Sequence, residues 1–227
     1  MTKITISFLA ALLLLSSVTG NTCEDRTAIH AEASQVQPLM AGMMAPDFMV
    51  RDAEGREIRY SAGEQDRPVV LTFYRGGWCP YCNLHLSELR LVEEQLGEMG
   101  YDIWFISIDK PELLLQSLDE PDIGYTIYSD SSLSATRAFG LAFKVDDALV
   151  EKYLTFDIDL EKASGESHHV LPAPATYIIG LDGIISFAYV NPDYKVRLHP
   201  DVLMAAAKTH LEGADGRIIE RRKQVRK

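Results

Sequence analysis

The stretch that decides the fold reads Val69-Val-Leu-Thr-Phe-Tyr-Arg-Gly-Gly-Trp-Cys-Pro-Tyr-Cys-Asn-Leu84. Its first six residues are mostly apolar, β-branched or aromatic, which is typical of a strand buried in a sheet that is covered on both faces. Two glycines then lead into a Cys-Pro-Tyr-Cys motif at the start of a predicted helix. Unpaired N–H groups at a helix N-terminus favour negative charge and lower a cysteine pKa to roughly 3.5 to 7.5. Cys79 and Cys82 are therefore the candidate redox pair, since their spacing allows a disulfide with little backbone movement.

The pattern on the C-terminal side of this motif predicts an α/β domain with parallel strands. Apolar residues recur at near-helical spacing as far as Gly100, which predicts one long helix packed on a sheet. Apolar strands at 103–108 and 125–128, each followed by a helix, favour βαβ units. Asp109 and Asp130 follow these strands, and we assign them to turns or caps because Asp favours local hydrogen bonds there.

Shorter signals complete the expected fold. A turn at Glu54-Gly55 between two extended runs predicts an N-terminal hairpin. The stretch 171–180 resumes the sheet, and a tight turn at Asp182-Gly183 makes the last two strands antiparallel. Pro200 opens a closing helix. The long connection 141–171 is weakly patterned, with a helix expected at 147–154.

The charge balance and the spacing of candidate ligands exclude some functions. The 227 residues include 33 acidic and 22 basic side chains and carry a net charge of -11. This charge argues against a nucleic-acid partner and against attraction to an anionic membrane surface. His168 and His169 have no third ligand at a useful spacing, so we expect no metal site. No cofactor is expected beyond the redox-active cysteines.

The ends of the chain indicate export and one main domain. Residues 1–20 combine Lys3, an apolar run and small residues ending at Gly20, which is the layout of a signal peptide. Residues 21–44 are expected to be a flexible arm, 45–212 the domain, and 213–227 a basic, solvated tail. Export implies a periplasmic or secreted protein in an oxidising compartment. An uncleaved membrane anchor and lipidation at Cys23 are the alternatives for the leader.

Three stretches together show a resemblance to a known family. With Ala45-Pro46-Asp47-Phe48, the motif at 73–83 and Pro174-Ala175-Thr176-Tyr177 in place, the chain resembles the thioredoxin fold. It is similar over about 45–212 to the peroxiredoxin-like branch of the alkyl hydroperoxide reductase and thiol-specific antioxidant group (AhpC/TSA, redoxin). The resemblance implies a central mixed sheet flanked by helices. It also implies a cis peptide bond at Pro174, after Ala173, facing the cysteines. The expected substrate groove consists of Trp78, Tyr81, Ala173 and Pro174.

The sequence departs from this family at the positions that activate peroxide. Laying the family's peroxide-binding loop on this chain puts Arg75 at its proline, Cys79 at its threonine and Cys82 at its peroxidatic cysteine. The family's distant arginine falls near Pro174. The peroxide-activating set is therefore largely absent, and Arg75 is the candidate for charge support from a new position.

Three functional hypotheses follow. The leading one is an antioxidant thiol-disulfide oxidoreductase acting on protein or small-molecule thiols and disulfides. In it Cys79 attacks and Cys82 resolves, because a thiol one turn inward loses acidity and access. The second is a thiol peroxidase in which hydroperoxides oxidise Cys82 to a sulfenic acid and Cys79 resolves it. The third is a redox-inert exported protein with a structural disulfide.

Overall fold

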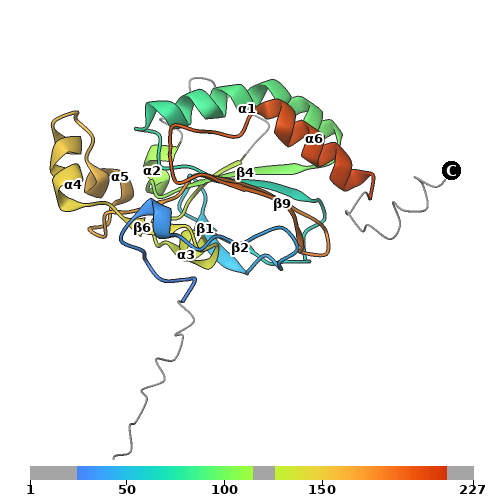
Figure 1. The fold of residues 1–227 in the computed structure, drawn as a ribbon, viewed down its shortest axis with the longest axis horizontal. Coiled ribbons are helices and arrows are strands. Elements are labelled where there is room, and N and C mark those ends of the chain that lie inside the picture. Colours follow the sequence, from blue (N-terminus) through green and yellow to red (C-terminus); the bar gives the residue numbers. More distant parts are fainter. Residues whose placement is uncertain (1–24, 115–125, 214–227) are drawn as a thin grey trace, which may run out of the picture.

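A seven-stranded mixed sheet forms the centre of the molecule (Figure 1). The computed structural model describes residues 25–114 and 126–213. Neighbouring strands follow the order β2-β1-β5-β4-β3-β8-β9, with β4 parallel to both β3 and β5, and β8 antiparallel to β3 and β9. The strands are β1 (Phe48–Arg51), β2 (Glu57–Tyr60), β3 (Val69–Phe73), β4 (Asp102–Ser107), β5 (Thr126–Ser129), β8 (Ala175–Ile179) and β9 (Ile185–Val190). The predicted mixed sheet and N-terminal hairpin are confirmed.

The quoted stretch forms an interior strand, a loop and the start of the longest described helix. Every residue of β3 is buried, as its composition predicts. The loop that follows contains Gly76 at φ 151, where an added Cβ would lie 2.3 Å from the Trp78 indole nitrogen. Only glycine fits this approach. Helix α1 (Pro80–Glu98) then begins with Cys79 as its N-cap and Pro80 in its first turn, a position that suits proline.

The helices cover both faces of this sheet. On one face, α1 lies beside α6 (Pro200–Leu211), and α3 (Ser134–Ala138) lies on the other (Figure 1). The Asp130 carboxylate accepts hydrogen bonds from the N–H groups of Ala135 and Thr136, which confirms its predicted capping role at α3. Helix α2 is described as Pro111–Leu114, and the rest of the helix expected there lies outside the described residues.

The weakly patterned connection folds into a small unit of its own. Strands β6 (Ala142–Lys144) and β7 (Val170–Pro172) pair as a separate two-stranded sheet. Between them, α4 (Asp147–Leu154) and α5 (Leu160–Ser164) project from one end of the molecule (Figure 1). The helix expected at 147–154 is confirmed. The stretch 171–180 divides at Ala173-Pro174 between β7 and β8, because its first residues pair with β6 instead of the main sheet.

The N-terminal segment at 25–44 packs on the domain, so the predicted flexible arm is wrong for these residues. Its backbone makes hydrogen bonds across the fold, from His30 to β6 and from Gly42 N to Ile185 O at 2.8 Å. Leu39 is buried in the main core. These contacts fix a stretch that lacks a regular pattern, apart from the short η1 (Ala33–Gln35). The predicted leader, Cys23 and nearly all of the basic tail lie outside the described residues. Within 25–114 and 126–213, no helix has the length and apolar character to cross a membrane.

Candidate redox site

The two cysteines of the motif meet beneath the start of α1. Both are free thiols in this structure, with Cys79 1% and Cys82 0% exposed. They belong to the apolar cluster between the sheet and the pair α1 and α6. The two thiols interact closely enough to shift each other's pKa in opposite directions. The structure therefore brings the predicted pair together, although neither sulfur is open to solvent.

The surroundings separate the acidities of these two thiols. The hydrogen bond from Cys82 lowers the pKa of Cys79 to about 6, helped by the charge on Arg75 and by the Cys82 N–H group. Burial raises the pKa of Cys82 well above its ordinary value, and the proton that it donates to Cys79 adds to this shift. At neutral pH the pair therefore carries one thiolate, which resides on Cys79.

Arg75, predicted to support charge, is buried in an aromatic box. Its guanidinium carbon lies 5.1 Å from the Trp78 ring centroid, 5.6 Å from that of Tyr153 and 4.2 Å from that of Tyr194. It also donates a hydrogen bond to the Tyr153 hydroxyl. These rings come from the loop between β3 and α1 (residues 74–79, the active-site loop), from α4 and from the loop before α6. Cation–π contacts of this kind hold a desolvated guanidinium in place, so the charge near Cys79 is fixed by three separate segments.

A second arginine, Arg197, escaped the sequence interpretation. It lies in the loop between β9 and α6, and its Nη2 donates to Cys82 Sγ at 3.1 Å. Its Nε donates to Tyr194 O at 2.6 Å. The adjacent Leu198 carbonyl lies 3.2 Å from Nε2 of His85 on α1. Burial lowers the pKa of His85 to about 4, so its ring is neutral and its Nε2–H can donate to that carbonyl.

This arginine had no sequence signal. The contact spans 115 positions, and the loop that carries Arg197 has neither periodicity nor a motif. The resemblance placed the family's arginine near Pro174, where this chain has none. A guanidinium therefore reaches the cysteine pair from a different element.

The structure corrects the prediction for Pro174. The described residues contain no cis peptide bond, so the expected cis geometry is wrong. Ala173 and Pro174 are both buried. Ala173 N donates to Leu141 O at 2.9 Å, and Pro174 O accepts from Asn191 N at 3.1 Å. Because these backbone groups are already bonded within the chain, the expected groove is not open to a partner strand in this structure.

The two aromatic residues expected in the same groove lie differently. Tyr81 is 43% exposed and contacts the Tyr194 ring edge-on, with centroids 5.5 Å apart. Trp78 is half-buried and packs against Tyr153. Tyr81 and the neighbouring loop at 191–199 therefore form the outer surface above the cysteines.

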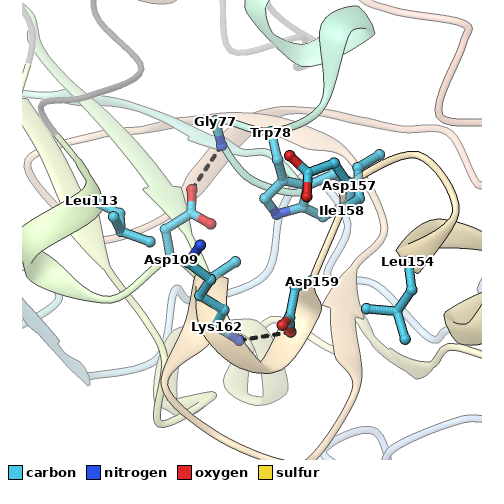
Figure 2. A pocket seen from close by; sticks show the side chains of 10 residues that line it. Gly77, Trp78, Asp109, Leu113, Leu154, Asp157, Ile158, Asp159 and Lys162 are labelled. Carbon is cyan, nitrogen blue, oxygen red and sulfur yellow. Dashed lines mark hydrogen bonds between the residues drawn. The ribbon is translucent and has the colours of Figure 1, made fainter.

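Asp109 joins the strand end to the active-site loop. Its Oδ2 accepts from Gly77 N at 2.7 Å (Figure 2). The same oxygen accepts from Ser107 Oγ at 3.1 Å. Besides its predicted role in the turn, Asp109 therefore also holds the loop at Gly77, 32 positions earlier in the chain. The adjacent histidines contact different groups, His168 the carbonyl of Ser131 and His169 the carboxylate of Glu161.

A dithiol at the head of the helix that follows a central strand defines a thiol-based oxidoreductase of the thioredoxin fold. The profile of the AhpC/TSA family matches residues 41–188. The chain belongs to this family, which confirms the resemblance.

Individual relatives agree with this assignment. The chain is 27% identical over 175 residues to "Peroxiredoxin Bcp" of Escherichia coli (strain K12), covering 77% of this chain and 99% of the relative. It is 28% identical over 102 residues to "Thiol-disulfide oxidoreductase ResA" of Halalkalibacterium halodurans, covering 44% and 57%. Among solved structures, peroxidoxin BcpB from Mycobacterium tuberculosis aligns with a TM-score of 0.58 at 19% identity, covering 75% and 97%. This last similarity supports the fold alone.

Proposed function

We propose that the chain is a thiol-disulfide oxidoreductase in which Cys79 attacks and Cys82 resolves. The order is carried by the unequal acidity of the two thiols, since Cys82 and the nearby charge of Arg75 lower the pKa of Cys79 to about 6. The thiolate is the nucleophilic form of cysteine. Cys82 lies one turn further in, with a raised pKa. The substrates are thiols and disulfides of proteins or small molecules.

The reaction proceeds in two exchanges. The Cys79 thiolate attacks one sulfur of a substrate disulfide, forms a mixed disulfide and expels the other sulfur as a thiolate. Cys82 then loses its proton and attacks the Cys79 sulfur. This step forms the Cys79–Cys82 disulfide and releases the second substrate thiolate. An external dithiol restores the enzyme by the reverse exchange, so the electrons come from that reductant.

Single-cysteine variants test the order of attack. In a Cys23→Ser background, Cys82→Ser is expected to trap a stable mixed disulfide with an excess of oxidised glutathione. The matched Cys79→Ser variant is expected to trap none, and both variants should fail to reduce insulin. Trapping on Cys82 instead, or full insulin reduction by either variant, would reject the proposed order.

Hydroperoxide reduction is a second candidate, supported by the arginines. Arg197 Nη2 contacts Cys82 Sγ, the position that corresponds to the family's peroxidatic cysteine. Arg75 Nε and Arg197 Nη1 are buried and have no hydrogen-bond partner among the described residues. They are donors that peroxide oxygens could accept from, in place of the missing threonine and arginine. A cysteine thiolate would attack the peroxide to give a sulfenic acid and an alkoxide or hydroxide, and the second thiol would form the disulfide with loss of water.

Rapid mixing with hydrogen peroxide separates the two candidates. Under the second candidate, the Cys79→Ser variant forms a sulfenic acid on Cys82 much faster than free cysteine reacts. A rate equal to that of free cysteine in the wild type and in both variants would remove peroxide reduction. Hydroperoxides would then not be substrates of this protein.

The remaining proposals concern the redox state and the compartment. A structural disulfide would have a reduction potential below about -300 mV, whereas a working pair lies above it. We expect the higher value, and no cofactor beyond the cysteines.

Export with cleavage after Gly20 predicts that the mature protein begins at Asn21. N-terminal sequencing of protein from the periplasm or medium tests this, and an intact leader would favour membrane anchoring.

A further inference from the structure

A cavity of about 390 Å³ lies between the active-site loop and the α4–α5 unit (Figure 2). A water molecule takes about 30 Å³ in the liquid, so the cavity has room for a small organic group. The apolar part of its wall consists of Trp78, Leu113, Leu154, Ile158 and Ala163. The charged lining residues are Asp109, Asp157, Asp159 and Lys162, which leaves an excess of negative charge. A ligand that fits should therefore combine positive charge with an apolar surface.

The Asp109 carboxylate forms the inner end of this cavity and is 2% exposed. Oδ2 accepts from Gly77 N and from Ser107 Oγ, but Oδ1 has no hydrogen-bond partner among the described residues. The Trp78 indole N–H faces the carboxylate closely enough to favour its charged form, yet it too lacks a partner of ordinary geometry. A buried carboxylate oxygen left in this way is costly. The unpaired oxygen therefore indicates that something in the cavity bonds to it.

The charge on Asp109 favours a cation over water in this place. Burial raises the pKa of Asp109 to about 6, so the carboxylate is ionised at pH 7.5. The Lys162 side chain is exposed at the rim and does not bond to Oδ1. Within the described residues, no group of three or more His, Cys, Asp or Glu side chains is placed to hold a metal ion. An organic cation fits both the carboxylate and the apolar walls.

We propose that this cavity binds a primary ammonium group carried on an aliphatic stem. The ammonium donates to Asp109 Oδ1, and the stem packs on Trp78 and Ile158. Asp157 and Asp159 are exposed at the outer end and would receive a second ammonium. A free diamine and the lysine side chain of a peptide share this chemistry. The site does not depend on thiol-disulfide exchange, although its ligand would contact Trp78, the residue before Cys79.

Tryptophan fluorescence measures the binding in the reduced, full-length protein at pH 7.5. The chain has two tryptophans, and Trp104 lies in the main core, so a Trp78→Phe variant identifies which ring responds. The probes are n-butylammonium, the neutral n-butanol and the anionic butyrate. We expect saturable binding of n-butylammonium, with n-butanol weaker by at least about tenfold, the lower range for a hydrogen bond to a charged group. Equal responses to the three probes, or none that saturates, would mean water only and would overturn the site.

Three variants locate the ammonium. Asp109→Asn keeps an oxygen for Gly77 N but removes the charge, so n-butylammonium should bind at least about tenfold more weakly. Lys162→Met removes a competing positive charge and should tighten binding by about twofold, as expected for an exposed charge. Asp66→Asn, which changes an exposed carboxylate in the loop before β3, should leave the affinity unchanged. Wild-type affinity in Asp109→Asn, or weaker binding in Lys162→Met, would overturn the proposal.

Two further probes separate the sources of the amine. These are 1,4-diaminobutane and lysine blocked at its α-amino and carboxyl groups. Asp157 has φ 60, a conformation that asparagine also adopts, so Asp157→Asn removes its charge without strain. Tighter binding of the diamine that weakens in Asp157→Asn would assign the site to free diamines, and tighter binding of the blocked lysine would assign it to a peptide side chain. If neither probe displaces n-butylammonium, the proposal fails.

Discussion

Removing the Cys82 thiol tests why Cys79 is acidic. The largest single cause of its lowered pKa is the hydrogen bond that Cys82 donates, ahead of the charge on Arg75. Hydrogen bonds to charged groups contribute about 1.5 to 3 kcal/mol, and one pKa unit corresponds to about 1.4 kcal/mol. Cys82→Ala should therefore raise the pKa of Cys79 from about 6 by about 1 to 2 units. Near pH 7 much of the thiolate would then be lost.

Cys82→Ser is the matched control, since its hydroxyl keeps a donor at the same place. Its Cys79 pKa should lie between those of the wild type and the alanine variant. The assay is the ultraviolet absorbance of the thiolate as a function of pH, in a Cys23→Ser background, with the iodoacetamide alkylation rate as an independent measure. Identical titration curves for the alanine variant and the wild type would refute the assigned cause. The acidity would then belong to the arginines and the helix terminus.

Three further perturbations have expected outcomes. Arg197→Gln removes the guanidinium that contacts Cys82 Sγ. The attack of Cys82 on the mixed disulfide, measured in single turnover, should slow by about tenfold, the lower range for a charged hydrogen bond. An unchanged rate would show that the contact has no part in this step. Tyr153→Phe removes the hydroxyl that accepts from Arg75 but keeps the ring; the pKa of Cys79 should stay within about 0.5 unit of the wild type if cation–π contacts suffice to hold the guanidinium. A cysteine whose pKa is lower in the folded than in the unfolded protein stabilises the fold most at pH values above its unfolded pKa. This contribution is lost as the pH falls towards the folded pKa. With a shift from 9.0 to about 6, reduced wild type should gain about 2 kcal/mol in unfolding free energy over Cys79→Ser between pH 6 and 8; parallel curves from denaturant unfolding would contradict the shift.

The elements nearest the motif could be predicted because their signals are local. The buried strand β3, the cysteine at the head of α1 and the parallel crossover to β4 follow from runs of apolar residues and their spacing. The N-terminal hairpin and the antiparallel turn at Asp182-Gly183 follow from turn chemistry in the same way. The family match then agrees with the fold.

What the sequence did not reveal depends on contacts between distant segments. Arg197 and Asp109 are set by packing across the sheet edge, and neither carries a pattern that distinguishes it from other loop arginines or strand-end acids. The same limit explains the errors. The arm at 25–44 looks unpatterned because backbone bonds to other segments hold it.

The charges around the cysteine pair also determine whether its reduction potential is raised or lowered. A pKa of about 6 in place of 9.0 raises the thiolate fraction of Cys79 at pH 7 from about a hundredth to about nine tenths. Only the reduced form gains from this, by about 1.4 kcal/mol, which corresponds to about 30 mV for a two-electron couple. Arg75 and Arg197 lose a counter-charge when the neutral disulfide forms, so they act in the same direction. We therefore expect the pair to be more oxidising than an unperturbed dithiol, and its disulfide to be correspondingly easier for an external thiol to reduce.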